Sequence, residues 1–342
     1  MNVLKRRYPV IAAVKIAVAA GLMWFLIHAG KLNTTAVAGA SRHWPILLLG
    51  VVLLYLQVAI GAWRWNLLLG VQGLRLPLHK AFSLTMIGAL FNIAIPGAVG
   101  GDVVKGYYVS RCTFERKAHA VTTVLVDRIV GLLGLLALAM FAGLLDWSLV
   151  RSNRTFTVLF VFTTASFLVA CLVLWISFAA TRESAVAVEQ WANRLPGSKV
   201  ITRVIESLLE YRGQPSVVLR AIAVSIVAQA LGCLAFYLSA LALGYADIPL
   251  RAYLLVVPLG LATTALPLAP GGIGVGQAAF YALFHLLPGV TGDMGANACT
   301  VFQCLTVLMD LTGLAFYFTY KQESVGEQLS GSALVVEVPL EG

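Results

Sequence analysis

The stretch NIAIPGAVGGD, residues 92–102, combines one proline, three glycines and an aspartate. Such a composition is typical of an exposed turn, yet the run AFSLTMIGALF before it, residues 81–91, is strongly apolar. Irregular backbone inside a bilayer is tolerated only where protein covers it or where it lines a wet cavity. The stretch therefore predicts a broken helix within a membrane protein.

The composition of the whole chain supports this interpretation. The 342 residues are 60% hydrophobic and only 11% charged, whereas soluble domains carry about 25% charged residues. Apolar runs of about 20 residues predict spanning helices. We expect six of them, at residues 10–29, 45–63, 119–145, 156–180, 217–243 and 295–320. The net charge of +9 is expected from cytoplasmic loops that face anionic lipid, and we expect no nucleic-acid partner.

Two further apolar regions, 81–114 and 252–287, are interrupted near the middle by proline and glycine. Each half has about 14 residues and would be roughly 21 Å long, which is short of the hydrocarbon core of about 30 Å. We therefore predict two re-entrant hairpins. Two strongly tilted full crossings at each place are the alternative.

The distribution of Lys and Arg orients the chain in the membrane. With the N-terminus inside, seventeen of the 24 lie on the cytoplasmic side, Arg64 among them. Five then lie outside and two, Lys15 and Arg128, lie in spans. Cytoplasmic loops are enriched in Lys and Arg. We expect a multi-pass protein of the cell (inner) membrane with both termini in the cytoplasm.

The two interruptions share a pattern, because PGAVGG (96–101) and PLAPGG (267–272) are both P-x-x-x-G-G. The predicted hairpins enter from opposite sides, and broken helices at equivalent places in inverted repeats point to a transport site. We thus expect an all-α polytopic protein organised as an inverted repeat. Its parts are a first repeat at 1–180, an amphipathic cytoplasmic linker at 181–216, the rest of the second repeat at 217–320 after its first span at 156–180, and a cytoplasmic tail at 321–342.

The first interruption has the residue types of an anion site. A turn that opens a helix directs several N–H groups and a positive dipole end at one spot. Lys105 follows Asp102 by three residues, which places both on one face, and Arg111 lies farther along the same arm. Alternatively, proline and glycine only shape a tight hairpin that Asp102 caps.

Charged residues inside predicted spans indicate either function or internal pairing. Asp127 and Arg128 lie in one span and Asp310 lies deep in the last. An ion pair of Arg128 with Asp102 or Asp310 is one interpretation; substrate binding or proton coupling is the other. In the second interruption, Gln277 is the main polar side chain.

Motifs of soluble enzymes do not occur. The sequence has no Walker A loop, no HExxH, no GxSxG and no cysteine–histidine cluster, and GGIGVG lacks the strand that a dinucleotide fingerprint requires. We therefore expect no cofactor, no metal site and no catalytic residue.

Three segments together, NIAIPGAVGGDVVKGYYVSR (92–111), VDRIVGLLGL (126–135) and LPLAPGGIGVGQ (266–277), resemble the flippase-like family of the lysylphosphatidylglycerol synthase transmembrane region. The resemblance implies movement of lipids between leaflets, with aminoacylated phospholipids, polyprenyl-phosphate-linked sugars and hopanoid-related lipids as candidate cargo. Gln277 departs from the family, which often has glutamate there. The positions that carry over are Asn92, Pro96, Gly100, Gly101, Asp102, Lys105, Asp127, Arg128, Pro267, Gly271, Gly272 and Gly274.

The leading prediction is thus a lipid transporter, not an enzyme, that binds a lipid with an anionic or phosphate-bearing head group at the two hairpins. We add Arg111, Gln277 and Asp310 to the expected substrate-binding residues. A membrane-embedded lipid phosphotransferase or phosphatase that uses Asp102 or Asp127 is the second hypothesis. A non-catalytic partner of a lipid-modifying complex is the third.

Overall fold

The structure is a computed structural model and describes residues 20–21, 23–74, 76–94, 100–111, 117–179, 209–264 and 272–320. Every regular element within these residues is helical, so the prediction of an all-α polytopic membrane protein is confirmed. Four predicted features fall largely or wholly outside these residues: the first span, the linker, the tail and the tips of both hairpins.

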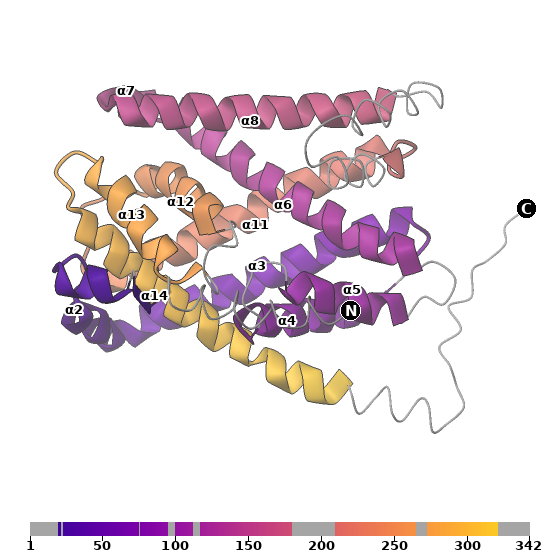
Figure 1. The fold of residues 1–342 in the computed structure, drawn as a ribbon, viewed down its shortest axis with the longest axis horizontal. Coiled ribbons are helices and arrows are strands. Elements are labelled where there is room, and N and C mark those ends of the chain that lie inside the picture. The colour runs from indigo at the N-terminus through magenta and orange to yellow at the C-terminus, as the bar shows by residue number, and fades with distance from the viewer. Residues whose placement is uncertain are drawn as a thin grey trace, which may run out of the picture.

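Five helical segments are long and apolar enough to cross a membrane, and they correspond to five of the six predicted spans. In Figure 1, α8 lies along the upper edge of the molecule, α6 and α14 slope in one direction, and α3 and α11 slope in the other. Their helices are α2 (Thr34–Gly39), η1 (Ala40–His43) and α3 (Trp44–Val71), then α6 (Lys117–Leu145), α8 (Arg154–Ala179), α11 (Pro215–Ala242) and α14 (Gly292–Leu311), which continues as helix to Tyr320. The short α7 (Trp147–Ser152) is capped by Asp146, whose side chain accepts a hydrogen bond from Leu149 N.

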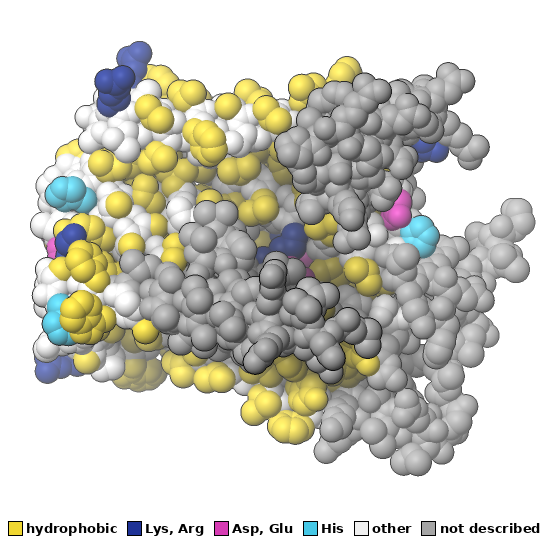
Figure 2. Space-filling view, in the orientation of Figure 1, with side chains coloured by type: hydrophobic (Ala, Val, Ile, Leu, Met, Phe, Trp, Pro, Cys, Tyr) yellow, Lys and Arg dark blue, Asp and Glu magenta, His cyan; other side chains and the backbone are white. Residues whose placement is uncertain are grey.

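The outer surface of these helices is apolar. Phe162 and Trp175 of α8 are 70% and 67% exposed, and Figure 2 shows hydrophobic side chains over much of one face. Exposed apolar patches of this extent are rare on soluble monomers. The surface is therefore suited to contact with lipid.

Both predicted hairpins are pairs of short helices. The first comprises α4 (Leu78–Ala94) and α5 (Gly100–Arg111), and the second α12 (Leu250–Thr264) and α13 (Val275–His285). The longest, α4 with 17 residues, extends about 26 Å at 1.5 Å per residue, less than a bilayer core of about 30 Å. In Figure 1, α4 and α5 lie in one half of the molecule and α12 and α13 in the other. Their entry from opposite membrane faces, and the inverted repeat, stay predictions.

The glycines of the two interruptions have different roles. Gly101 lies in the first turn of α5, and a Cβ there would stand 2.0 Å from the carbonyl oxygen of Gly88 in α4. Gly272 and Gly274 precede α13 and have positive φ angles of 70° and 82°, which L-residues rarely adopt. The shared P-x-x-x-G-G pattern thus allows a close helix contact in one hairpin and a left-handed turn in the other.

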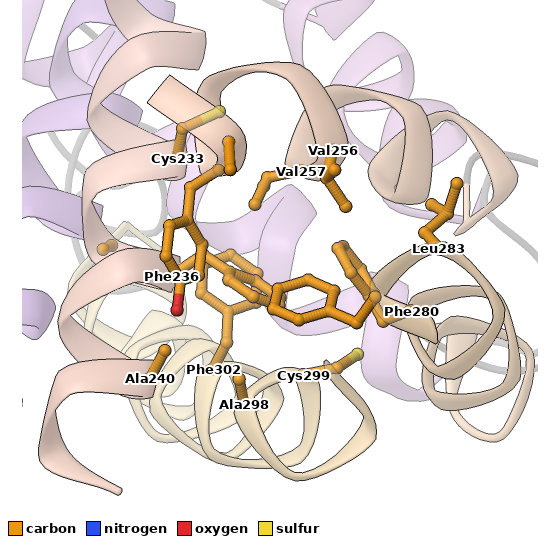
Figure 3. Packing of buried hydrophobic residues seen from close by; sticks show 14 of the residues in the cluster. Cys233, Phe236, Ala240, Val256, Val257, Phe280, Leu283, Ala298, Cys299 and Phe302 are labelled. Atoms are coloured by element: carbon orange, nitrogen blue, oxygen red, sulfur yellow. The ribbon is translucent and has the colours of Figure 1, made fainter. Parts of the chain in front are cut away.

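Aromatic packing holds the second hairpin in the bundle. Phe236 of α11 stacks on Phe280 of α13 with ring centroids 4.5 Å apart, and Phe302 of α14 lies 5.4 Å from Phe236. Figure 3 shows these rings directed toward one another between the helices. Gly260 of α12 makes room, because a Cβ there would lie 2.4 Å from the Phe280 ring. Close packing of this kind stabilises helices in lipid, where burial from water contributes little.

Candidate functional site

A cluster of buried charges lies where α3, α5 and α6 meet. The Asp127 carboxylate of α6 accepts a hydrogen bond from Arg64 Nε at 2.8 Å and contacts Lys105 Nζ of α5 at 3.5 Å. All three side chains are nearly buried. Taking charges out of water is strongly unfavourable unless they are paired and hydrogen-bonded. The two cations therefore depend on the one carboxylate that they share.

The position of Arg64 corrects the topology that we predicted from the sequence. We predicted that the second span ends at residue 63 and that Arg64 lies in a cytoplasmic loop, but α3 continues as helix to Val71. The Arg64 guanidinium points into the bundle, where Nη1 donates to Ser225 Oγ of α11 at 2.8 Å. Arg64 thus links three helices, and sequence reasoning missed it as a site residue. The sequence feature that could have indicated the longer helix is the apolar run NLLLGV, which begins two positions after Arg64.

Lys105 has a second partner besides Asp127. Its ammonium lies 3.8 Å from the centroid of the Trp65 ring, a cation–π contact. The ring is held in place because Trp65 Nε1 donates to Thr123 Oγ1 at 3.1 Å. Lys105 is therefore directed toward α3 and α6, and its binding of an anion together with Asp102 stays a prediction.

The Asp102–Arg128 ion pair forms the more exposed side of this cluster. The Arg128 guanidinium donates through Nε to Asp102 Oδ2, so one of the two pairings considered from the sequence is present. Asp102 lies in the first turn of α5, where the helix dipole favours a negative charge. The Arg128 side chain is 42% exposed, and Figure 2 shows basic and acidic side chains together in a hollow of the hydrophobic face.

The start of α5 is tied to the end of α4. The described part of α5 begins at Gly100, and Gly101 N donates to Asn92 Oδ1 at 2.9 Å. One N–H of the predicted anion site is therefore bonded to an amide oxygen in this arrangement. Some expected site residues lie outside what the structure describes, namely Pro96, Pro267 and Gly271, and the side chain of Arg111.

Gln277 connects the second hairpin to α14. Its side chain is buried, with Oε1 accepting from Gly274 N at 2.7 Å and Nε2 donating to Gln303 Oε1 at 2.7 Å. The amide thus caps the start of α13 and fixes it against α14. The neutral Gln277 amide therefore accepts a hydrogen bond at the start of α13 and donates one to α14.

A cavity of about 250 Å³ lies between the two hairpins. It brings Asn92 of the first hairpin together with Asp310 of α14 and with the ends of α12 and α13. Its lining residues are Asn92, Leu261, Thr264, Ile273, Phe280, Cys299, Phe302, Gln303, Thr306, Val307 and Asp310. The expected site residues therefore form two groups, the charge cluster with Asp102, Lys105, Asp127 and Arg128, and the cavity with Asn92 and Asp310.

The chemistry available to the charge cluster is binding of an anion. Among the described residues, Arg64, Lys105 and Arg128 contact the two carboxylates of Asp102 and Asp127. Within the described parts of the chain, no three His, Cys, Asp or Glu side chains gather so that they could hold a metal ion.

Comparison with known proteins gave one family. The family model described as "Lysylphosphatidylglycerol synthase TM region" matches residues 12–312, which is most of the chain. It includes α3 to α14 and both groups of site residues. The comparison with curated proteins gave no match.

Proposed function

The chain belongs to the family of the lysylphosphatidylglycerol synthase transmembrane region, and from this premise we propose that it is a lipid transporter, a flippase or scramblase. The membership indicates a membrane protein connected with lipids. We propose that the cargo is a phospholipid or a polyprenyl-phosphate-linked amphiphile with an anionic head group. The lipid classes are those that the family resemblance implies, and the charges of the site support the anionic head group.

The observation that supports the proposal is the cluster of cations beside the first interruption, one of which, Arg128, is partly exposed. Asp127 pairs with the two buried cations, Arg64 and Lys105, whereas Arg128 pairs with Asp102 and its side chain is partly exposed. A lipid phosphate can exchange with the Asp102 carboxylate on the guanidinium, which binds oxyanions in a bidentate manner. The buried cations behind it raise the local potential for the incoming anion.

A path for the head group requires polar lining at membrane depth. The charge cluster and Asn92 supply it, since the Asn92 amide contacts α5 at Gly101, one residue before Asp102. Broken helices that meet near the middle of a bilayer are typical of transport sites. We propose that the head group passes beside the charge cluster while the acyl chains stay in the surrounding lipid.

The test is lipid translocation by the purified protein in proteoliposomes, with a labelled anionic phospholipid and Arg128→Met. Loss of a charge-assisted contact worth about 1.5–3 kcal/mol should slow transport roughly ten- to a hundredfold. Arg251→Met is the matched control, because Arg251 is 69% exposed and pairs with Asp146, which caps α7. It should transport at the unmodified rate.

Two outcomes would refute the proposal. Full transport by Arg128→Met would place the head-group site elsewhere in the protein. A change in the mass of the lipid, catalysed by the purified protein and absent in Asp102→Asn, would identify an enzyme instead.

A further inference from the structure

The cavity contains a carboxylate that the charge cluster does not use. Asp310 is about nine-tenths buried and lines the cavity. Within the described residues, no ion pair or hydrogen bond reaches its side chain. An ionised group in such a place needs a partner or water. The unexplained negative charge indicates that the cavity receives something positive.

Two threonine hydroxyls of the cavity present oxygen lone pairs. Gln303, Thr306 and Asp310 recur along one face of α14, at the spacing that aligns residues on a helix, and all three line the cavity. Thr306 Oγ1 donates its proton to the Phe302 carbonyl at 2.9 Å, and Thr264 Oγ1 donates to Leu261 O at 2.7 Å. Since both hydroxyl protons are directed to the backbone, their oxygens can only accept toward the cavity.

The last described residues of α4 and α12 lie close to the cavity. The described part of α4 ends at Ala94, two residues before Pro96, and that of α12 ends at Thr264, three residues before Pro267. Asn92 lies two residues before the last described residue of α4, Thr264 is the last described residue of α12, and both line the cavity. The C-terminal ends of helices attract cations, and broken helices coordinate ions in this way.

One backbone N–H at the start of α5 and one at the start of α13 already have partners within the protein. At α5, Gly101 N is bonded to Asn92 Oδ1, and at α13, Gly274 N is bonded to Gln277 Oε1. Both N–H groups therefore point at amide oxygens of the protein. Neither is directed at the Asp310 carboxylate.

We propose that this cavity binds a monovalent metal cation, with Asp310 as the charged ligand and with Thr306 and Thr264 as neutral oxygen ligands. One carboxylate matches one positive charge, whereas Mg²⁺ and Ca²⁺ sites recruit more charge or substrate phosphate. The cavity of about 250 Å³ also has room for a partly hydrated ion, since a water occupies about 30 Å³ of liquid. The proposal concerns an ion and stands apart from the transported lipid.

The experiment is thermal unfolding of the purified full-length protein in detergent, at constant ionic strength. NaCl or KCl replaces N-methylglucamine chloride in steps. A ligand that binds only the folded state stabilises it in a saturable way, so we expect the melting temperature to rise by a few degrees, on the order expected for such linkage, and then level off. Asp310→Asn keeps the shape and removes the charge, and it should abolish the rise.

Asp293→Asn is the matched control, because Asp293 lies in the first turn of the same helix and outside the cavity. It should keep the full response. If Asp310→Asn does not fold, the same salt titration is carried out with Thr306→Val. This substitution removes one oxygen ligand at nearly constant volume and should raise the half-saturating salt concentration several-fold.

Three results would overturn the proposal. One is a response that is equal in Asp310→Asn and the unmodified protein, or unchanged in Thr306→Val. Another is a melting temperature that follows pH but neither Na⁺ nor K⁺, which would assign a proton to the carboxylate. The third is stabilisation by an amine-bearing lipid without any effect of metal ions. Because binding is measured without transport, failure here leaves the proposed function to its own test.

Discussion

Replacing Asp127 by asparagine should destabilise the fold strongly. The substitution keeps the size and one acceptor oxygen, but it leaves Arg64 and Lys105 nearly buried without their shared counter-charge. At an effective dielectric constant of about 20, the Coulomb attraction lost over 2.8 Å and 3.5 Å is about 6 and about 5 kcal/mol. Rehydration of the freed cations offsets much of it, and removal of one partner from a buried pair typically costs about 3–5 kcal/mol.

The assay is reversible unfolding in mixed micelles, followed by tryptophan fluorescence, to which Trp65 beside Lys105 contributes. Adding Lys105→Met to Asp127→Asn removes one unpaired cation. The double variant should therefore be more stable than Asp127→Asn alone, although less stable than the unmodified protein.

Asp146→Asn serves as the control for this experiment. Asp146 is as buried as Asp127, but its partner Arg251 is 69% exposed and free to return to water. Asparagine also caps helices well, so the loss should stay below about 1 kcal/mol, as for exposed pairs. A loss of less than about 1 kcal/mol for Asp127→Asn as well would mean that water solvates the cluster, and the reasoning from burial would fail.

Two further predictions concern the hairpins. Gly101→Ala should destabilise the protein by about 1–3 kcal/mol or more in the same unfolding assay, because its Cβ would collide with the Gly88 carbonyl. The control Gly106→Ala meets only ordinary contacts at 3.7 Å and should be tolerated. Equal melting temperatures for the two variants would contradict the close contact. Cysteines at Val99 and Ala269, in a background without native cysteines, should react with impermeant thiol reagents from the cytoplasmic and the outer side respectively, and labelling of both from one side would refute the inverted repeat.

The positions of the helices could be predicted from the sequence, but the contacts between their charged residues could not. Apolar length alone located five spans, because lipid requires about 20 apolar residues from any crossing helix. The same criterion placed Arg64 outside the membrane, since a charge at the end of such a run is indistinguishable from a loop. Its partner Asp127 is 63 positions away, and local patterns contain no information about that distance.

The candidate site was predictable to a similar degree. Proline and glycine identified the interruption, and the Asp102–Arg128 pair was among the alternatives because both charges were expected within the bilayer. The cavity was not foreseen, since Asn92 and Asp310 meet there only through the packing of α4 against α14. The Gly88–Gly101 contact was equally hidden, because a glycine in a turn gives no indication of what approaches it.

The ion pair of Arg64 with Asp127 also has a consequence for biosynthesis. The two residues are 63 positions apart, and ribosomes add about 5–20 residues per second, so the cation is made about 3–13 seconds before its partner. During that interval α3 carries an uncompensated charge, which weakens its insertion into lipid. We expect α3 to remain beside the translocon until α6 arrives, so that the two helices leave it together.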